Sequence, residues 1–412
     1  MNRIYLDYAA TTPVDKSVLK AMLPYFSQKF GNPMSIHSFG YEGEAAVEKS
    51  RKITADFLHC LPDEVIFTSG ATESNNLAIK GFSKKYHFSQ PGKKHFIPHI
   101  ITTAFEHHCV LNSVKFLEES GQAEVTYLPV YKDGIVRVED VKNAIRDNTR
   151  FISIMYVNNE IGTVQPIEKI GKLIKDINKI QSRLGGTEFK ILFHTDATQA
   201  INYFNCDVQK LGVDLLSLSG HKFYGPKGIG ALYVKKGSFI KRIQDGGDQE
   251  FGMRAGTHNV PGIVGLAEAL AGIKTQSRGF GTKIKIMTSL RDYLISRVLK
   301  EIPEVKLNGS KKFRSPNNAN FSLANVEGES LILSLNREGI ACSTGSACST
   351  GSLEPSHVLL ALGLPPEEAH GSLRVSLGKD TTRKEIEVFI EKLKKVVKKL
   401  RNISGNVLKE YK

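Results

Sequence analysis

The sequence lacks the features that place a protein in a membrane or direct it out of the cytoplasm. No apolar run in the 412 residues reaches the roughly 20 residues that a membrane-spanning helix needs. The opening stretch MNRIYLDYAATTP has neither the apolar core of a signal peptide nor the arginine-rich character of a transit peptide. These absences exclude an integral membrane protein, and we expect a cytoplasmic protein that has no membrane partner.

The chain also has few cysteines, and their spacing suits neither a disulfide framework nor a zinc site. Their number, five, is odd, and no C-x-x-C pair occurs. Disulfide scaffolds and zinc knuckles normally show even counts or such pairs. We therefore expect free thiols in a reducing compartment and no bound metal. The five are Cys60, Cys109, Cys206, Cys342 and Cys348.

Acidic residues are outnumbered, and the net charge is +14. Much of the excess lies in short basic stretches at 84–95, 311–312 and 391–402. Such charge can attract RNA or an acidic protein, or it can belong to solvated helix faces and loops. Because no aromatic-rich nucleic-acid motif accompanies the charge, we favour the second interpretation and expect no direct nucleic-acid binding.

Long repeats and low-complexity blocks are absent, and the length fits two or three globular domains. Short apolar runs alternate with segments of helical periodicity from about residue 60 to 235. This alternation predicts an α/β fold built on a buried and largely parallel sheet. The runs are 64–70, 99–105, 150–157, 189–197, 213–220 and 230–236.

The later part of the chain has a different pattern of apolar residues. Residues 263–302 predict one long helix or two, and strand-like stretches NNANFSLAN and GSLRVSLG follow. A last helix should begin at Thr382, with Glu385 completing a capping box and an apolar face running from Ile386 to Leu400. We expect a second, smaller α+β domain, with the boundary between residues 255 and 265.

Polar residues follow the ends of several predicted strands. A helix should begin at Ala71 and Thr72 directly after a strand, and free N–H groups at a helix start bind anions. Asp196 ends another apolar strand, where a carboxylate is costly without a cationic partner. It is either an N-cap for the next segment or a counter-ion for a protonated ring nitrogen.

Lys222 follows the next strand, in the stretch LSLSGHKFYGPKG. It is either a surface lysine in a turn or an amine suited to Schiff-base chemistry in a cramped, partly desolvated place. Ser219 and His221 could donate hydrogen bonds to a phosphate. The pairing of Asp196 with Lys222 favours the functional interpretation, since pyridoxal phosphate (PLP) needs an amine, a pyridinium partner and a phosphate cradle.

Several long motifs match one known family, in that family's order and over nearly the whole chain. The most specific are FTSGATESNNLAIKG (67–81), HTDATQ (194–199), SLSGHKFYGPKGIGALYV (217–234) and STGSACSTGSLEPSHVL (343–359). The sequence resembles the cysteine desulfurases of the NifS/IscS type, in the class V aminotransferase family of fold-type I PLP enzymes. This resemblance implies a mainly parallel seven-stranded sheet in a large PLP-binding domain at 15–260. It places residues 1–14 and 261–412 in the small domain.

The resemblance also implies roles for individual residues. Lys222 would form the Schiff base with PLP and remove the substrate's α-proton. Asp196 would pair with the ring nitrogen, Gln199 would bond the ring hydroxyl, and His107 would stack on the ring and assist proton transfer. The implied phosphate site comprises Ala71, Thr72, Ser219 and His221, with Thr257 reaching the phosphate of the partner subunit. Asn159, beside the cofactor, and Arg374 would bind the substrate carboxylate.

The stretch ACSTGSACSTGS at 341–352 places two cysteines among small, flexible residues. The resemblance makes Cys348 the nucleophile that takes sulfur from L-cysteine, leaves L-alanine and holds a persulfide. A loop at about 341–354 would carry this thiol between two sites. For Cys342 we favour a bystander at a strand end over a sulfur relay or a regulatory disulfide. Cys109, in an HHC stretch that a related group has around its reactive cysteine, is interpreted as a packing thiol.

The resemblance further implies a homodimer that passes sulfur to an acceptor, either an iron–sulfur scaffold protein or a tRNA-thiolation protein. Three alternatives stay open at this stage. An aminotransferase on the same fold has no use for Cys348, whereas a selenocysteine lyase could use it. A cofactor-free scaffold is disfavoured because Lys222, Asp196, Gln199 and Cys348 are all present.

Overall fold

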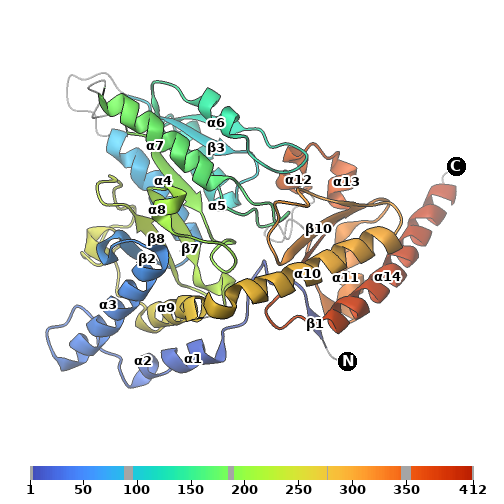
Figure 1. The fold of residues 1–412 in the computed structure, drawn as a ribbon, viewed down its shortest axis with the longest axis horizontal. Coiled ribbons are helices and arrows are strands. Elements are labelled where there is room, and N and C mark those ends of the chain that lie inside the picture. The colour runs from blue at the N-terminus through green and yellow to red at the C-terminus, as the bar shows by residue number, and fades with distance from the viewer. Residues whose placement is uncertain (1–2, 88–95, 184–189, 276, 345–353, 411–412) are drawn as a thin grey trace.

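The computed structural model describes residues 3–87, 96–183, 190–275, 277–344 and 354–410, and it has a large sheet at its centre (Figure 1). That sheet has seven strands in the order β2-β8-β7-β6-β5-β3-β4. Strand β8 runs antiparallel to both neighbours, and the other pairs are parallel. The predicted α/β fold with a mainly parallel seven-stranded sheet is confirmed. The strands are β2 Val65–Thr68, β3 His99–Thr103, β4 Glu124–Leu128, β5 Thr149–Ser153, β6 Leu192–Asp196, β7 Leu215–Ser219 and β8 Gly230–Val234.

Each of the predicted apolar runs coincides with one of these strands, although β5 begins one residue before its run, and β4 is the strand that the runs did not predict. It is an edge strand with only β3 beside it. Glu124 and Tyr127 are exposed, whereas Leu128 is buried. An edge strand that is half covered does not need a continuous apolar run, so its sequence, EVTYL, lacks the signal that identifies the central strands.

The continuous apolar runs arise because helices cover both faces of the large sheet. Consecutive residues of a strand point to opposite faces. Phe151 accordingly packs with the side chains of α4 and α5, whereas Ile152 packs with those of α3, α7 and α9. The helices of this part are α1 Lys16–Met22, α2 Pro24–Ser27, α3 Ser38–Leu58, α4 Ala71–His87, α5 His108–Glu119, α6 Val138–Ala144, α7 Ile167–Arg183, α8 Val208–Leu211 and α9 Val260–Thr275.

A second, smaller core lies around a three-stranded antiparallel sheet, in the order β12-β10-β9, and a parallel pair formed by β1 and β11. Ile4 and Leu6 belong to this core, so the start of the chain packs with its later part. The elements are β1 Ile4–Tyr5, β9 Val305–Leu307, β10 Asn318–Leu323, β11 Ile340–Ala341, β12 Ser372–Ser376, α10 Ser277–Glu301, α11 Gly328–Arg337, α12 His357–Ala361, α13 Pro366–His370 and α14 Arg383–Glu410.

The helices predicted for this later part are found. The stretch 263–302 forms two helices, α9 and α10, and α10 runs between the two cores (Figure 1). The capping box before α14 is present: Thr382 N–H donates to Glu385 Oε2 at 2.7 Å, and Glu385 N–H donates to Thr382 Oγ1 at 3.3 Å. The predicted apolar face of α14 is buried in the small core, with Leu400 partly buried at its end.

The division of the chain at residues 14/15 and 260/261 stays a prediction, and the packing adds one feature to it. Val358 and Leu359 of α12 are buried in the core of the large sheet. The segment that follows the cysteine-containing stretch therefore reaches across to the large sheet.

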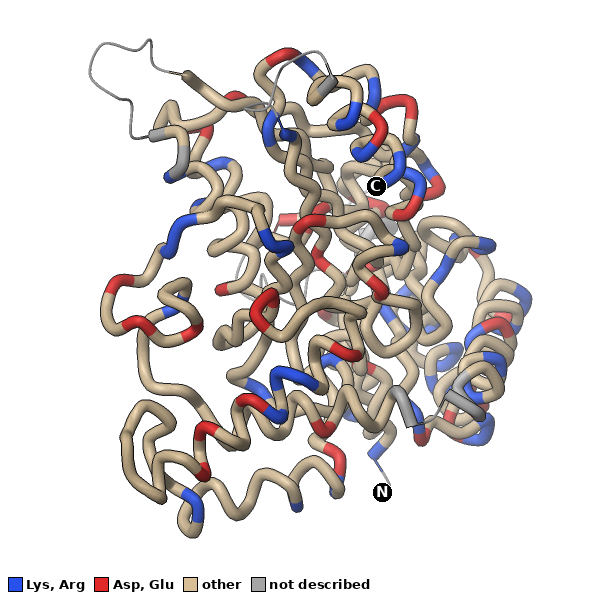
Figure 2. The backbone as a smooth tube through the Cα atoms, turned by 60° about the vertical axis from the view of Figure 1, so that its left-hand side comes forward, with Lys and Arg blue, Asp and Glu red and all other residues tan. Residues whose placement is uncertain are grey.

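Lys and Arg are interspersed with Asp and Glu along most of the backbone (Figure 2). No helix in the described part is long and apolar enough to cross a membrane.

Candidate active site

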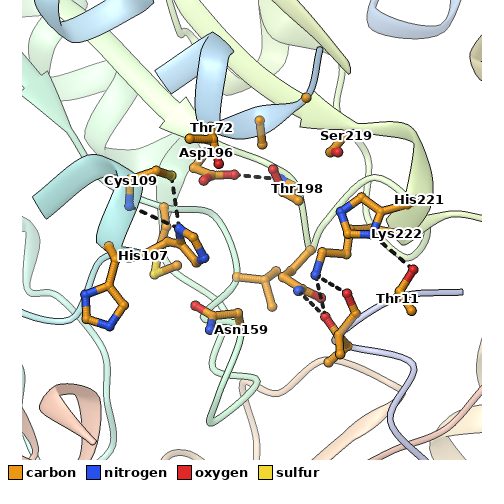
Figure 3. A pocket seen from close by; sticks show the side chains of 18 of the residues that line it. Thr11, Thr72, His107, Cys109, Asn159, Asp196, Thr198, Ser219, His221 and Lys222 are labelled. Carbon is orange, nitrogen blue, oxygen red and sulfur yellow. Dashed lines mark hydrogen bonds between the residues drawn. The ribbon is translucent and has the colours of Figure 1, made fainter. Parts of the chain in front are cut away.

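A cavity of about 580 Å³ lies at the carboxyl ends of β2, β6 and β7. Arg374 of β12 and His357 of α12, both from the later part of the chain, also line it. Thr257 does not line this cavity and is exposed, in the segment before α9. Cys348 lies outside the described residues. The predicted site residues that do line the cavity are Ala71, Thr72, His107, Asn159, Asp196, Gln199, Ser219, His221, Lys222 and Arg374. Most of them are labelled in Figure 3.

These residues meet because parallel strands end at one edge of a sheet. Strands β6 and β7 are paired with Asp196 opposite Ser217, so their last residues, Asp196 and Ser219, reach the same edge. Strand β2 runs in the same direction, since both β2 and β7 are antiparallel to β8. Gly230 at the start of β8 permits the close approach, because a Cβ there would lie 2.7 Å from the Cα of Gly70.

The turn between β2 and α4 presents the start of a 17-residue helix to the cavity. The first N–H groups of an α-helix have no partner within the helix, and the helix dipole favours an anion beside them. Glu73 accepts a hydrogen bond from Ser69 N–H at 2.7 Å, which fixes the turn. His221 lies opposite, with Nδ1 3.1 Å from Thr11 Oγ1. Burial, with Lys222 and Lys227 nearby, lowers the pKa of His221 to about 4.

Asp196 is a buried carboxylate that is hydrogen-bonded but has no cationic partner among the described residues. Its Oδ2 accepts from Asn75 Nδ2 at 2.7 Å, and its Oδ1 accepts from Thr198 N–H at 2.9 Å. A buried carboxylate normally needs a positive partner. The site therefore fits a ligand that brings a cationic N–H to Asp196.

Lys222 ends a short 3₁₀ turn, Gly220–Lys222, directly after β7. Its Nζ donates to the carbonyl oxygens of Ala9 and Ala10, each at 2.7 Å. The side chain points into the cavity from the side opposite Asp196 (Figure 3). Gln199 donates to the same carbonyl of Ala9 at 2.9 Å. The N-terminal segment thus orients both an amine and an amide toward the cavity.

His107 is the N-cap residue of α5 and lies beside Cys109. Its Nδ1 accepts the N–H of Cys109 at 3.2 Å and lies 3.0 Å from the thiol sulfur. Burial lowers the pKa of His107. A backbone N–H can only donate, so Nδ1 is an acceptor, and the neutral ring carries its proton on Nε2. His107 is therefore a neutral imidazole in the cavity wall.

Arg374 and Asn159 lie next to each other in the cavity wall. Arg374 is 2% exposed; it forms an ion pair with Asp7 at 2.8 Å and donates to the Asn159 carbonyl at 3.0 Å. Among the described residues, Arg374 Nε and Asn159 Oδ1 are buried and lack hydrogen-bond partners. An unsatisfied buried donor on a guanidinium fits a ligand carboxylate.

Sequence reasoning missed several residues that shape the site. Asn75 links Asp196 to Cys109, with Nδ2 3.0 Å from the thiol sulfur. It lies one helical turn after Ala71, so its spacing could have identified it. Asp7 pairs with Arg374 across 367 positions, and no local pattern reveals such a pair. His108 and His357, whose ring centroids are 4.5 Å apart, also line the cavity.

The four described cysteines are free thiols, and their surroundings keep them protonated. Burial, together with neighbouring carboxylates, raises the pKa of Cys60, Cys109 and Cys342 to about 12, and burial also raises the pKa of Cys206. Cys342 is 8% exposed in the small core. The beginning of the stretch predicted as a loop is therefore packed: Ala341 belongs to β11, and Ser343 pairs with Arg374.

Taken together, the described residues fit PLP. An amine, a buried carboxylate without a cation and an anion-binding helix start converge on one cavity, and the sheet around them is the fold-type I architecture. No cluster of three or more metal-ligating side chains occurs in the described part of the chain. The fold and site define the protein as a PLP-dependent enzyme of this architecture.

Comparisons with known proteins agree with this assignment. The model of the class-V aminotransferase family matches residues 4–389. The cysteine desulfurase IscS of Dictyoglomus turgidum is 50% identical over 401 residues, which is 97% of this chain and 96% of the relative. A solved NifS-like protein superposes with a TM-score of 0.85 at 36% identity, covering 96% of this chain and 99% of the other. A structure described as SspA in complex with cysteine has a TM-score of 0.76 at 38% identity, covering 92% and 100%. The chain belongs to the class-V aminotransferase family and, within it, to the cysteine desulfurases of the IscS/NifS type.

Proposed function

We propose that the protein is a PLP-dependent cysteine desulfurase, which converts L-cysteine to L-alanine and holds the sulfur on Cys348. The observation that carries the proposal is the convergence of Lys222, Asp196 and Arg374 on one cavity. Among the described residues, the buried Arg374 Nε lacks a hydrogen-bond partner and, as a donor, matches the carboxylate end of an amino acid. The family relationship and the cysteine-bound structural neighbour support this choice of substrate.

Each part of the cavity would hold one part of PLP. Asp196 would accept from the protonated ring nitrogen, Gln199 would bond the ring hydroxyl, and His107 would lie against the ring. The start of α4 at Ala71 and Thr72 would bind the phosphate, together with the side chains of Ser219 and His221. When bound, PLP supplies an electron sink for the α-carbon of an amino acid.

The chain's own groups would then carry out the reaction. Arg374 and Asn159 hold the substrate carboxylate, and Lys222 takes the proton from the α-carbon. The Cys348 thiolate attacks the substrate sulfur, so that an S–S bond forms and the C–S bond breaks. The carbon fragment leaves with the electron pair of that bond and is protonated to L-alanine. One thiol and one cysteine give one persulfide and one alanine, so no outside oxidant is needed.

Product analysis tests this function. We expect the PLP-loaded protein, supplied with L-cysteine and a thiol reductant, to form alanine and sulfide in equal amounts. An aminotransferase would instead form an oxo acid that depends on an amino acceptor. A parallel assay with L-selenocysteine separates a desulfurase from a selenocysteine lyase, which would use the selenium compound and leave L-cysteine unchanged.

The Arg374→Leu variant tests the substrate-carboxylate site. A charge-assisted hydrogen bond is worth about 1.5–3 kcal/mol, so we expect KM for L-cysteine to rise about 10- to 150-fold. The cofactor's visible absorption should stay unchanged. Asp7→Asn is the matched control, since it breaks the same ion pair but keeps the guanidinium. An equal rise in KM for both variants would mean that Arg374 supports the fold rather than the substrate.

A homodimer is part of the proposal. Large apolar side chains are exposed along α1, α2 and the start of α3, among them Phe26 at 60%, Phe30 at 66% and Ile36 at 90%. Exposed apolar surface of this extent is typical of an interaction site. A second copy of the chain would cover this surface, and the exposed Thr257 would reach the phosphate of the partner subunit.

The sulfur acceptor is proposed from the family relationship. We infer that the persulfide passes to an iron–sulfur scaffold protein, with a tRNA-thiolation protein as the second candidate. A cytoplasmic location fits both acceptors. Both would receive sulfur by attack of an acceptor thiolate on the outer sulfur of the persulfide, which restores Cys348 for another turnover.

A further inference from the structure

The segment 250–258 adopts a backbone conformation that needs support from elsewhere. Glu250 and Phe251 have φ values of 48° and 57°, in the left-handed region that residues other than glycine rarely adopt. Two such residues in succession are unfavourable unless the surroundings hold them in place. The segment leads directly to Thr257, which is exposed.

A buried ion pair supplies this support. Arg51 of α3 donates to both carboxylate oxygens of Glu250, each at 2.9 Å, and the two residues are 2% and 4% exposed. The guanidinium also lies between two rings, 5.0 Å from the centroid of Phe67 and 4.9 Å from that of Phe251. Burial alone would raise the pKa of Glu250, but the hydrogen bonds from Arg51 and His258 outweigh it and keep that pKa below its usual value.

The same contacts reach the strand that leads to the phosphate-binding turn. Glu250 accepts from Phe67 N–H at 2.7 Å, and Arg51 donates to the Val65 carbonyl at 2.6 Å, so both ends of the pair bond to β2. Three residues after Phe67, β2 gives way to the turn at Gly70. Neither contact depends on a local sequence pattern, since Arg51 and Glu250 are 199 positions apart.

A second ion pair connects the segment to the turn itself. Arg254 Nε donates to Glu73 Oε1 at 2.8 Å, and Glu73 Oε2 accepts from Ser69 N–H at 2.7 Å. A cavity of about 210 Å³ lies between the turn and the segment, lined by Ser69, Arg254 and Thr257 among others. The segment is therefore fixed to β2 through Glu250 and to the turn through Arg254, with a hollow between the segment and the turn.

We propose that the buried Arg51–Glu250 pair is a positioning device for the cofactor phosphate. It holds the segment 250–258 and the turn at 69–72 in one fixed arrangement, so that Thr257 is presented to the phosphate bound by a second copy of the chain. This inference rests on the proposed PLP-dependent homodimer. Arg51 and Glu250 would not touch the cofactor, and they would act through Thr257 and the turn.

The test compares two forms of the cofactor. In the full-length dimer, Glu250→Gln should weaken PLP binding by about tenfold or more, because the neutral amide cannot hold the guanidinium bidentately. Binding of pyridoxal, which lacks the phosphate, should change less than twofold. The binding of PLP and the binding of pyridoxal are both followed by visible absorption. Neither measurement needs turnover, so failure of the proposed desulfurase activity would not obscure the result.

Asp214→Asn is the matched control. Asp214 is buried to a similar extent, at 5% exposed; it accepts a strand N–H from Phe193 at 3.1 Å and pairs with Lys190 at 2.8 Å, and neither partner belongs to the segment or the turn. It should leave the ratio of PLP to pyridoxal affinity unchanged. A general loss of stability in Glu250→Gln would weaken both ligands equally, and that result would overturn the proposal.

Thr257→Ala keeps the proposal testable if Glu250→Gln does not fold. Thr257 is exposed, so its replacement should not disturb the core. We expect the same selective loss of PLP affinity in this variant, and unchanged PLP affinity would contradict the proposal. Arg51→Lys, which keeps the charge but not the fork, should give an intermediate loss.

Discussion

Replacement of Lys222 by alanine should lower kcat for alanine formation by about 1000-fold or more, since a positioned general base contributes about 10²- to 10⁴-fold and the amine that binds PLP is lost as well. The amine is placed for both tasks, because it points into the cavity and donates to the carbonyls of Ala9 and Ala10. Borohydride treatment should fix PLP to the wild-type protein but not to the variant.

Lys227 provides the matched control for this experiment. It also lines the cavity, five positions further along the chain, but it is exposed. We expect Lys227→Ala to keep kcat within about tenfold of the wild type, because an exposed charge makes only a small electrostatic contribution. If Lys227→Ala loses the activity and Lys222→Ala keeps it, the assignment of the Schiff-base lysine is wrong.

Replacement of Cys348 by alanine should reduce alanine and sulfide formation by at least about 100-fold while leaving the binding of PLP and L-cysteine intact. The argument combines the family motif with the state of the other thiols. Cys60, Cys109, Cys206 and Cys342 all have pKa values raised by burial, and a protonated thiol is a poor nucleophile. Cys348 lies outside the described residues, so its role rests on the motif and on this elimination.

Two control variants separate Cys348 from its neighbours. Cys109 lines the cavity, and Cys342 lies six positions before Cys348, directly after β11. We expect Cys109→Ala and Cys342→Ala to keep most of the alanine formation. Loss of activity in Cys342→Ala alone would identify that thiol as the nucleophile, or as a necessary relay.

The sequence predicted the central strands because helices bury both faces of the sheet, and burial on both faces requires continuous apolar runs. It did not predict β4, whose exposed Glu124 and Tyr127 interrupt the pattern at the sheet edge. It also gave no sign that Cys342 is buried. That burial depends on the pairing of β11 with β1, which brings residues 4 and 340 together.

The sequence likewise predicted some parts of the candidate site and not others. Asp196 and Lys222 were identifiable because each follows an apolar strand, and ends of parallel strands meet at one edge. The contacts that orient Lys222 and Arg374 were not identifiable, because they come from remote parts of the chain. The carbonyls of Ala9 and Ala10 and the carboxylate of Asp7 lie more than 200 positions from the side chains that they bind.

The location of sulfur after a single turnover tests the central claim most directly. The PLP-loaded protein would be mixed with less than one equivalent of L-cysteine without reductant, digested after alkylation, and its cysteine peptides weighed by mass spectrometry. The account predicts one added sulfur atom on the peptide that contains Cys348, in the same amount as the alanine formed. Sulfur on the peptides of Cys109 or Cys342 instead, or alanine formed without any protein-bound sulfur, would contradict it.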